Sequence, residues 1–398
     1  MKKKLLMALW ICLSLVLFHA CDEPETNEIT SIHLDPRVND SLPLSSIAKK
    51  IEYIALESHP DALLGPYGTP RFFEDKIFIV SNKSVYCFHE SGLYLYKISR
   101  VGQGPGEYVT ISSLLIDSKN RHLEILDRQN RNILLFSLDD GSFISIKECP
   151  THTSSFQLLN DSTYLLYTRG LGAIMTDGSP RLEYILFTAH RTTGKLMDGF
   201  FPGESRLYPW YPFIWSDEQK RVYLPYNDTV YNITADTIIP AFAIDFGELQ
   251  ISPSYFPMSY MDKIKNENLR DNKAYLFKVM ESDHELLLET SYDGYHQHHF
   301  WSKSSGKTIS FTKLFDDIDK LEYYIKLKTN HKNKWICMID AVDIITQENF
   351  EETSGYKKLI QANWEPNENS NPIIALISLK KTELEPNQIK KLFFLFSY

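Results

Sequence analysis

Cysteine is scarce in this chain, and the few that occur do not form a disulfide framework. Of the 5 cysteines, Cys12 and Cys21 lie near the start, which leaves Cys87, Cys149 and Cys337. Three well-separated thiols are too few for a small fold held together by disulfides. We therefore predict that these three are buried, small apolar residues. A bridge between two of them is the open alternative.

The chain also lacks an excess of basic charge. It has 42 Lys and Arg against 51 Asp and Glu, a formal net charge of −9, and the acidic residues are spread along the sequence. Such a balance provides no long-range attraction for phosphate backbones. We therefore expect no nucleic-acid partner.

Signatures of catalysis are missing as well. No Gly-x-Ser-x-Gly elbow for a nucleophile occurs. Residues 296–299 (His-Gln-His-His) could place two imidazoles on one face of a strand, but ordinary surface histidines are the favoured interpretation, because no carboxylate partner is identifiable. We predict no catalytic residue, no metal and no cofactor.

The first twenty residues carry the firmest targeting signal. Three lysines at positions 2–4 precede an apolar run from Leu5 to Phe18. A run of this length is short for a membrane-spanning helix, which needs about 20 residues. Residues 1–20 are therefore predicted to be a cleaved signal peptide.

The end of this segment resembles a bacterial lipobox, because Ala20 directly precedes Cys21. Phe18 departs from the pattern, which prefers leucine at that position. The resemblance implies that Cys21 is acylated and that its partner is membrane lipid. Acidic residues follow at once, resembling an export tag for the outer membrane. We expect a lipid anchor in the bacterial outer membrane, facing either the periplasm or the cell surface.

Residues 21–46 are polar, contain three prolines and show little periodicity, as expected for a flexible tether. Beyond them, short β-rich runs recur in a strand, turn, strand pattern. The clearest examples are residues 77–88, 123–136 and 221–233. The spacing is about 48 residues, or twice that, which is typical of propeller blades with four strands each.

The predicted fold class is therefore all-β, with residues 47–398 forming a six-bladed β-propeller of four-stranded blades. Residues 259–271 and 342–362 have helical patterns and are predicted to be short insertions. The ring is expected to close by pairing an early strand at residues 51–56 with a late strand at residues 372–379, because this pairing removes an open edge.

A glycine-rich segment at residues 98–108 closely resembles the signature of a family of bacterial six-bladed β-propeller lipoproteins that are related in architecture to NHL-repeat propellers. The resemblance implies the fold and names no catalytic residue. The segment is favoured as a structural corner between blades. A ligand-binding role is the alternative, and its candidates are Arg100, Gly102, Gln103, Gly104, Gly106, Glu107 and Tyr108.

A second candidate is an aromatic, proline-punctuated stretch at residues 200–215. Packing between blades is the favoured role, but aromatic loops also stack on sugars or anchor proteins. The candidate binding residues there are Tyr208, Trp210, Tyr211 and Trp215.

These observations favour a membrane-anchored, non-enzymatic module of the cell envelope. Its ligand, an unknown protein or glycan, is expected at one face of the central channel, where loops converge. One alternative is a propeller hydrolase or lyase, either lactonase-like or acting on polysaccharides, with its site in the channel. The other is a scaffold subunit of an envelope complex.

Overall fold

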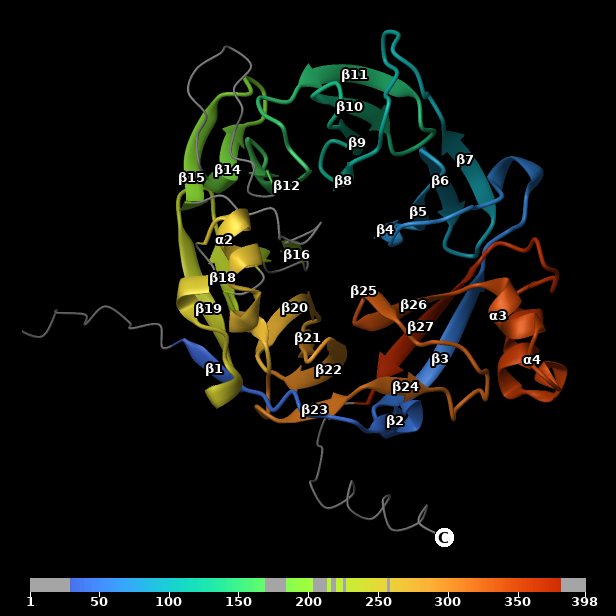
Figure 1. The fold of residues 1–398 in the computed structure, drawn as a ribbon. Coiled ribbons are helices and arrows are strands. Elements are labelled where there is room, and N and C mark those ends of the chain that lie inside the picture. The colour runs from blue at the N-terminus through green and yellow to red at the C-terminus, as the bar shows by residue number, and fades with distance from the viewer. Residues whose placement is uncertain are drawn as a thin grey trace, which may run out of the picture.

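The strands form a ring of six sheets, or blades, around a central channel (Figure 1). The computed structural model describes residues 29–168, 184–202, 213–215, 220–224, 227–255 and 258–380. Within each blade, neighbouring strands that follow one another in the chain are antiparallel, and the first strand lies nearest the channel. The predicted all-β, six-bladed propeller is confirmed.

Blades 1 to 3 follow one another along the chain, each with four strands. Blade 1 contains β4 (Arg71–Phe73), β5 (Lys76–Ser81), β6 (Ser84–His89) and β7 (Tyr94–Ile98). Blade 2 contains β8 (Ser113–Asp117), β9 (His122–Asp127), β10 (Asn132–Ser137) and β11 (Phe143–Glu148). Blade 3 contains β12 (Ser155–Asn160), β13 (Thr163–Tyr167), β14 (Tyr184–His190) and β15 (Leu196–Pro202).

Blades 4 and 6 also use strands from the N-terminal part of the chain. Blade 4 contains β16 (Phe213–Trp215), β17 (Lys220–Tyr223), β18 (Thr229–Ile233), β19 (Ile238–Asp245) and β1 (Thr30–His33). Blade 5 contains β20 (Ala274–Glu281), β21 (Glu285–Tyr292), β22 (Tyr295–Ser302) and β23 (Thr308–Phe311). Blade 6 contains β25 (Leu327–His331), β26 (Lys334–Ile339), β27 (Ile373–Leu379) and β3 (Ala48–Ala55).

The two inner hairpin strands of a blade differ from its outer strand in their burial. In blade 2, β9 and β10 are almost continuously buried, because both of their faces pack against neighbouring blades. The outer strand β11 alternates between half-buried and exposed residues. This difference explains why the inner hairpins are continuous apolar runs in the sequence, whereas the outer strands alternate.

The ring closes between the two ends of the propeller. Strand β3, from the start of the chain, pairs antiparallel with β27, with Ile54 opposite Ile374 and Ile51 opposite Ile377. The predicted closing pair is therefore confirmed.

The structure differs from the expected tether in its second half. Strand β1 pairs in parallel with β19, and β2 (Ser41–Pro43) pairs in parallel with β24 (Lys313–Phe315). Ile32 and Leu34 are buried between blades 4 and 5, and Leu44 between blades 5 and 6. Because these apolar side chains leave water, residues 30–46 are not a flexible linker. We call residues 30–47 the N-terminal strap.

Helices are few and short, and they lie where the sequence predicted insertions. The segment after blade 4 contains α2 (Tyr260–Lys265), and the long β26–β27 connection contains α3 (Ala341–Ile345) and α4 (Ser354–Gln361). Single 3-10 turns occur at Leu44–Ser46, Pro60–Ala62, Gly247–Leu249, Pro253–Tyr255, Glu267–Arg270 and Phe350–Glu352. Among the described residues, no helix has the length and apolar character needed to cross a membrane.

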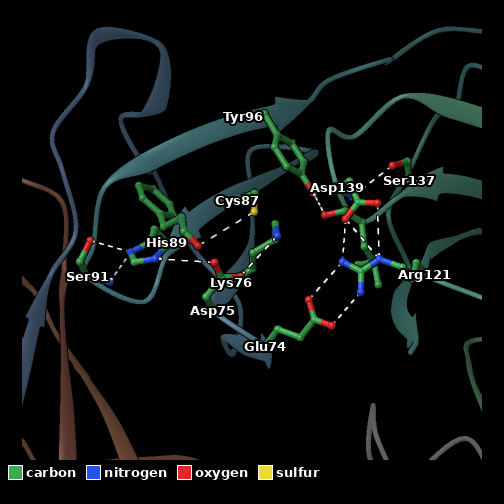
Figure 2. A network of polar contacts seen from close by, with 12 residues as sticks. Glu74, Asp75, Lys76, Cys87, His89, Ser91, Tyr96, Arg121, Ser137 and Asp139 are labelled. Carbon is green, nitrogen blue, oxygen red and sulfur yellow. Dashed lines mark hydrogen bonds and ion pairs between the residues drawn. The ribbon is translucent and has the colours of Figure 1, made fainter. Parts of the chain in front are cut away.

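Polar contacts join blades 1 and 2 through the β4–β5 turn of blade 1 and the β8–β9 turn of blade 2 (Figure 2). The Arg121 guanidinium of blade 2 contacts Glu74 of blade 1 at 2.7 Å and Asp139 of its own blade at 2.7 Å. It also lies over the Phe73 ring, 5.5 Å from the centroid. Because Arg121 is 41% exposed, solvent screens these ion pairs and they contribute little to stability. The network orients the two hairpins more than it stabilises the fold.

The three cysteines of the propeller are unpaired and buried, so the favoured prediction for them is confirmed. Burial raises the pKa of the Cys87 thiol to about 12 and that of Cys337 to about 12. The thiols are therefore neutral at ordinary pH and act as small apolar residues.

Candidate functional site

The central channel holds a hollow of about 620 Å³ to which all six blades contribute. Most of its walls come from the innermost strands β4, β8, β12, β20 and β25, with Tyr223 added from β17. The innermost strands approach one another only because the blades close into a ring. Residues from the whole length of the propeller therefore meet at this one place.

Basic side chains gather on one side of the hollow. Arg71 comes from β4, Lys278 from β20 and Lys328 from β25, and Lys332 follows β25 directly. Blades 5, 6 and 1 supply them, and these blades are consecutive around the ring. The cations therefore form a continuous arc, which we call the basic arc.

Two lysines of this arc have no neutralising partner. Among the described residues, neither Lys328 nor Lys332 makes an ion pair or a side-chain hydrogen bond. Lys278 donates to Glu289 at 3.4 Å and to the Leu327 carbonyl at 3.3 Å. Burial lowers the pKa of Lys278, and the nearby Glu289 carboxylate opposes that shift.

The carboxylates of the same hollow are already engaged. Glu281 is held by Arg221 at 2.8 Å and by Lys303 at 2.6 Å, and its side chain is fully buried. Asp283 accepts a hydrogen bond from Asn333 at 2.7 Å. These contacts leave Lys328 and Lys332 without direct compensation by the acidic residues of the hollow.

On the opposite side of the hollow, the lining residues that the structure describes carry no charge. Blade 2 contributes Ser112, Ser113 and Leu114, and blade 3 contributes Gln157. Hydroxyl and amide groups of this kind donate and accept hydrogen bonds without imposing a charge. The hollow therefore has a cationic side and a neutral polar side.

The glycine-rich segment lies elsewhere, between β7 of blade 1 and β8 of blade 2. Tyr108 is fully buried and donates its hydroxyl to the carbonyl of Lys83 at 2.9 Å. Glu107 accepts a hydrogen bond from the backbone of Gly104 at 2.8 Å. A Cβ at Gly102 would lie 1.9 Å from the Glu107 carboxylate, so a larger residue there would displace the Glu107 side chain from its observed position.

This loop borders its own hollow of about 490 Å³ at the outer strand β11. Gln103, Gly104, Gly106 and Glu107 line it together with Phe143 and Ile146. Arg100 lies over the Phe143 ring, 5.2 Å from the centroid. These contacts favour the structural role of the loop as a corner between blades. A ligand role for its residues stays a prediction, and such a ligand would bind at the outer edge of the ring and not in the channel.

The other predicted site residues fall outside what the structure describes. Cys21, Tyr208, Trp210 and Tyr211 are not among the described residues, and the side chain of Trp215 is not described either. The backbone of Trp215 belongs to β16, the innermost strand of blade 4. Lipidation and the aromatic binding loop remain predictions.

The histidine-rich segment forms part of β22. His299 is buried and contacts Thr290 at 2.9 Å and Ser310 at 2.8 Å, and burial lowers its pKa to about 4. His298 is stacked on Phe311 with 5.3 Å between ring centroids. These two side chains pack within the blade and are not surface histidines, and their contacts are those of structural residues.

A buried acidic cluster between blades 2 and 3 has no counterpart among the sequence predictions. Asp117, His122 and Glu124 present ligand atoms that lie within 4.8 Å of one another. However, the Arg191 guanidinium of blade 3 contacts both carboxylates, and Tyr164 donates to Glu124 at 2.5 Å. A fixed cation already occupies the position that a metal ion would take, so the cluster is an ion-pair network that joins two blades.

Comparisons with known proteins agree with the architecture. An exported protein from Bacteroides fragilis is similar in structure, with a TM-score of 0.68 and 17% identity, and the match covers 89% of this chain and 100% of that chain. At this identity the likeness shows the fold alone. A DUF4221 family member from Bacteroides vulgatus matches less well, with a TM-score of 0.47 and 10% identity over 84% of this chain and 97% of that chain.

No curated protein matches the sequence. The model of one family, described as a domain of unknown function, matches residues 29–378. The glycine-rich signature and the relation to NHL propellers stay predictions beside this assignment. Since the match includes the strap and all six blades, the chain belongs to the DUF4934 family.

Proposed function

We propose that the protein is a lipid-anchored binding module of the bacterial cell envelope, with its ligand site in the central channel. The observation that carries the proposal is the hollow of about 620 Å³ that all six blades build together. Its volume lies in the range of small-molecule sites, about 300–1,000 Å³. Lysines without partners on one side and hydrogen-bonding groups on the other provide the means of recognition.

The predicted anchor at Cys21 supports the location that we propose. The acidic residues Asp22, Glu23 and Glu25 follow it in the manner of an outer-membrane export tag. Several acyl chains on one cysteine provide stable attachment, since each buried methylene contributes about 0.8 kcal/mol. The site would then sample the periplasm or the exterior.

A binding role fits the channel better than hydrolase or lyase chemistry does. An enzyme of that kind would use carboxylates or a metal in the hollow. Glu281, the carboxylate at the hollow that is fully buried, is held between Arg221 and Lys303 and cannot approach a substrate. The basic arc instead offers fixed charge for recognition.

The proposal is tested by filling the channel. Gln157→Trp and Thr329→Trp together place two large side chains on the innermost strands β12 and β25. The control pair, Thr192→Trp and Asn268→Trp, lies on exposed turns outside the hollow. Immobilised full-length protein in detergent is exposed to the small-molecule and glycan fractions of cell envelopes and medium, and bound compounds are identified by mass spectrometry.

We expect a compound that the wild type and the control retain and the filled-channel variant loses. Equal retention by all three proteins would place binding outside the channel and overturn the proposal. Failure of the wild type to retain any compound would leave the scaffold role in its place. Circular dichroism on each variant confirms that the ring has folded.

A further inference from the structure

We infer that the ligand of the channel is a small hydroxylated anion, such as an acidic sugar or a sugar phosphate, whose charged group contacts the basic arc. The inference rests on the proposed function, because it names the ligand class for the same hollow. The arc places positive charge on blades 5, 6 and 1, and positive charge recognises carboxylate and phosphate groups.

The first step of the argument is the sign of the charge. Among the described residues that line the hollow, four are cations (Arg71, Lys278, Lys328 and Lys332) and two are carboxylates (Glu281 and Asp283). The whole chain carries a net charge of −9, so the charge of these lining residues is opposite in sign to the net charge of the chain. Channel walls of low dielectric focus such a field and attract ions of the opposite sign.

The second step is that the counter-charges are already engaged. Glu281 binds Arg221 and Lys303 from outside the hollow. Lys328 and Lys332 have no ion pair within the described part of the chain, and Lys332 is exposed. An incoming carboxylate or phosphate would therefore gain charge-assisted hydrogen bonds without displacing an existing partner.

The third step concerns the body of the ligand. On the side opposite the arc, Ser113 and Gln157 offer neutral donors and acceptors, and beside the arc itself Thr69 and Thr329 add hydroxyl groups. Groups of this type pair with sugar hydroxyls and do not favour an apolar body. A ligand with charge at one end and hydroxyls along the rest matches both sides of the hollow.

The experiment uses two anions and their neutral counterparts. Digalacturonate carries carboxylates and is paired with the corresponding neutral galactobiose, and glucose 1-phosphate carries a phosphate and is paired with glucose. Calorimetry on the full-length protein in detergent, at low salt and with about 5 mM ligand, detects any dissociation constant near about 1 mM. The two anions separate a carboxylate ligand from a phosphate ligand.

The key variant is Lys328→Gln with Lys332→Gln. The control is Lys49→Gln with Lys313→Gln, which removes the same charge from exposed positions on β3 and β24 at the outer edge of the ring. We expect one anion to bind at least about tenfold more tightly than its neutral counterpart, and the key variant to lose at least about tenfold. The control should bind within about twofold of the wild type, and added salt should weaken binding.

Three results would overturn the inference: equal binding of an anion and its neutral counterpart, unchanged affinity in the key variant, or binding of neither anion to the wild type. The first two leave the channel proposal standing if the filled-channel variant still abolishes binding. If neither anion binds, the capture experiment distinguishes a failure of this inference from a failure of the proposed function, because it can still identify a neutral ligand that binds in the same channel.

Discussion

Asp228 shows how one buried side chain can tie two blades together. It lies between β17 and β18 of blade 4 and accepts hydrogen bonds from the backbone of Leu276 in blade 5 at 2.8 Å and from Gln250 at 2.5 Å. Burial raises the pKa of this carboxyl from 3.8 to about 7, against the opposing effect of the Leu276 hydrogen bond. The group is therefore protonated in the fold at pH values where it would ionise in the unfolded chain.

This shift predicts a pH dependence of stability. Between pH 3.8 and about 7 the folded state holds one more proton than the unfolded state, so the free energy of unfolding falls as the pH rises through that window. The contribution of Asp228 is complete below pH 3.8 and is lost by about pH 7, with a total of roughly 4 kcal/mol at most. Asp228→Asn removes the titrating group, and urea unfolding across this range should show a flatter profile. An identical slope in both proteins would contradict the assignment.

Gly92, in the turn between β6 and β7, is a second residue whose effect reaches another blade. Its φ is +94°, and a Cβ there would lie 1.9 Å from the carbonyl oxygen of Ala55 on β3. The Gly92 carbonyl also accepts a hydrogen bond from the backbone of Glu57 at 2.9 Å. The turn therefore packs directly on the strand that closes the ring.

Gly92→Ala should destabilise the fold more than Gly294→Ala does. Gly294 also has a positive φ, +78°, but no atom lies within 4 Å of the position that a Cβ would take, so alanine there brings only backbone strain of about 1–2 kcal/mol. At Gly92 the backbone of β3 must also move, which adds about 1–3 kcal/mol. Thermal unfolding of the two variants measures the difference, and equal losses would show that the contact with Ala55 relaxes freely.

The N-terminal strap is the element that sequence analysis failed to predict. Its strands are only four and three residues long, too short for a periodic pattern, and Pro36 and Pro43 suggest a loop. The inner hairpins were predictable because their buried runs, such as Ile77–Ile79, are interrupted by polar turns at regular spacing. The local sequence pattern was therefore sufficient to predict the blades. The strap forms strands only by pairing with β19 and β24, which lie far away in the sequence.

The strap predicts different effects for two similar substitutions. Ile32 is 1% exposed between blades 4 and 5, whereas Ile29 is 48% exposed just before β1. Ile32→Ala should lower the free energy of unfolding by about 2–5 kcal/mol, because it leaves a cavity in the core. Ile29→Ala should change it by no more than about 0.5 kcal/mol. Denaturant unfolding provides both values, and a small effect at Ile32 would mean that β1 does not pack on the ring in solution.

The candidate site forms only when all six blades have closed into a ring, which explains why its residues were not found in the sequence. Arg71 and Lys328 are far apart along the chain and meet only when blade 6 closes against blade 1. Residues 328–331 (Lys-Thr-Asn-His) carry no strand signal by themselves. The Arg191 network is hidden for the same reason, since its carboxylate partners come from another blade. The prediction of six blades does, however, indicate which strands line the channel, because the first strand of each propeller blade lies nearest to it.

The predicted anchor can be tested on the intact protein. Cys21→Ser should abolish incorporation of labelled palmitate and move the protein out of the membrane fraction, because the acylated thiol is lost. Cys12→Ser, within the signal segment, removes a thiol without touching the lipobox and should leave labelling unchanged. Labelling and fractionation by immunoblot provide the measurement. A Cys21→Ser protein that is still labelled would contradict the assignment.

The strap also determines how an anchored ring would hang from the membrane. Strand β1 lies on the outer edge of blade 4, and Ile29 follows Cys21 by 8 residues (29 − 21), a reach of at most about 28 Å. A lipid at Cys21 would therefore attach the molecule to the membrane through the outer edge of blade 4. Attachment at the rim would leave both mouths of the channel uncovered, and blade 1 lies opposite blade 4 in the ring, farthest from that attachment (Figure 1).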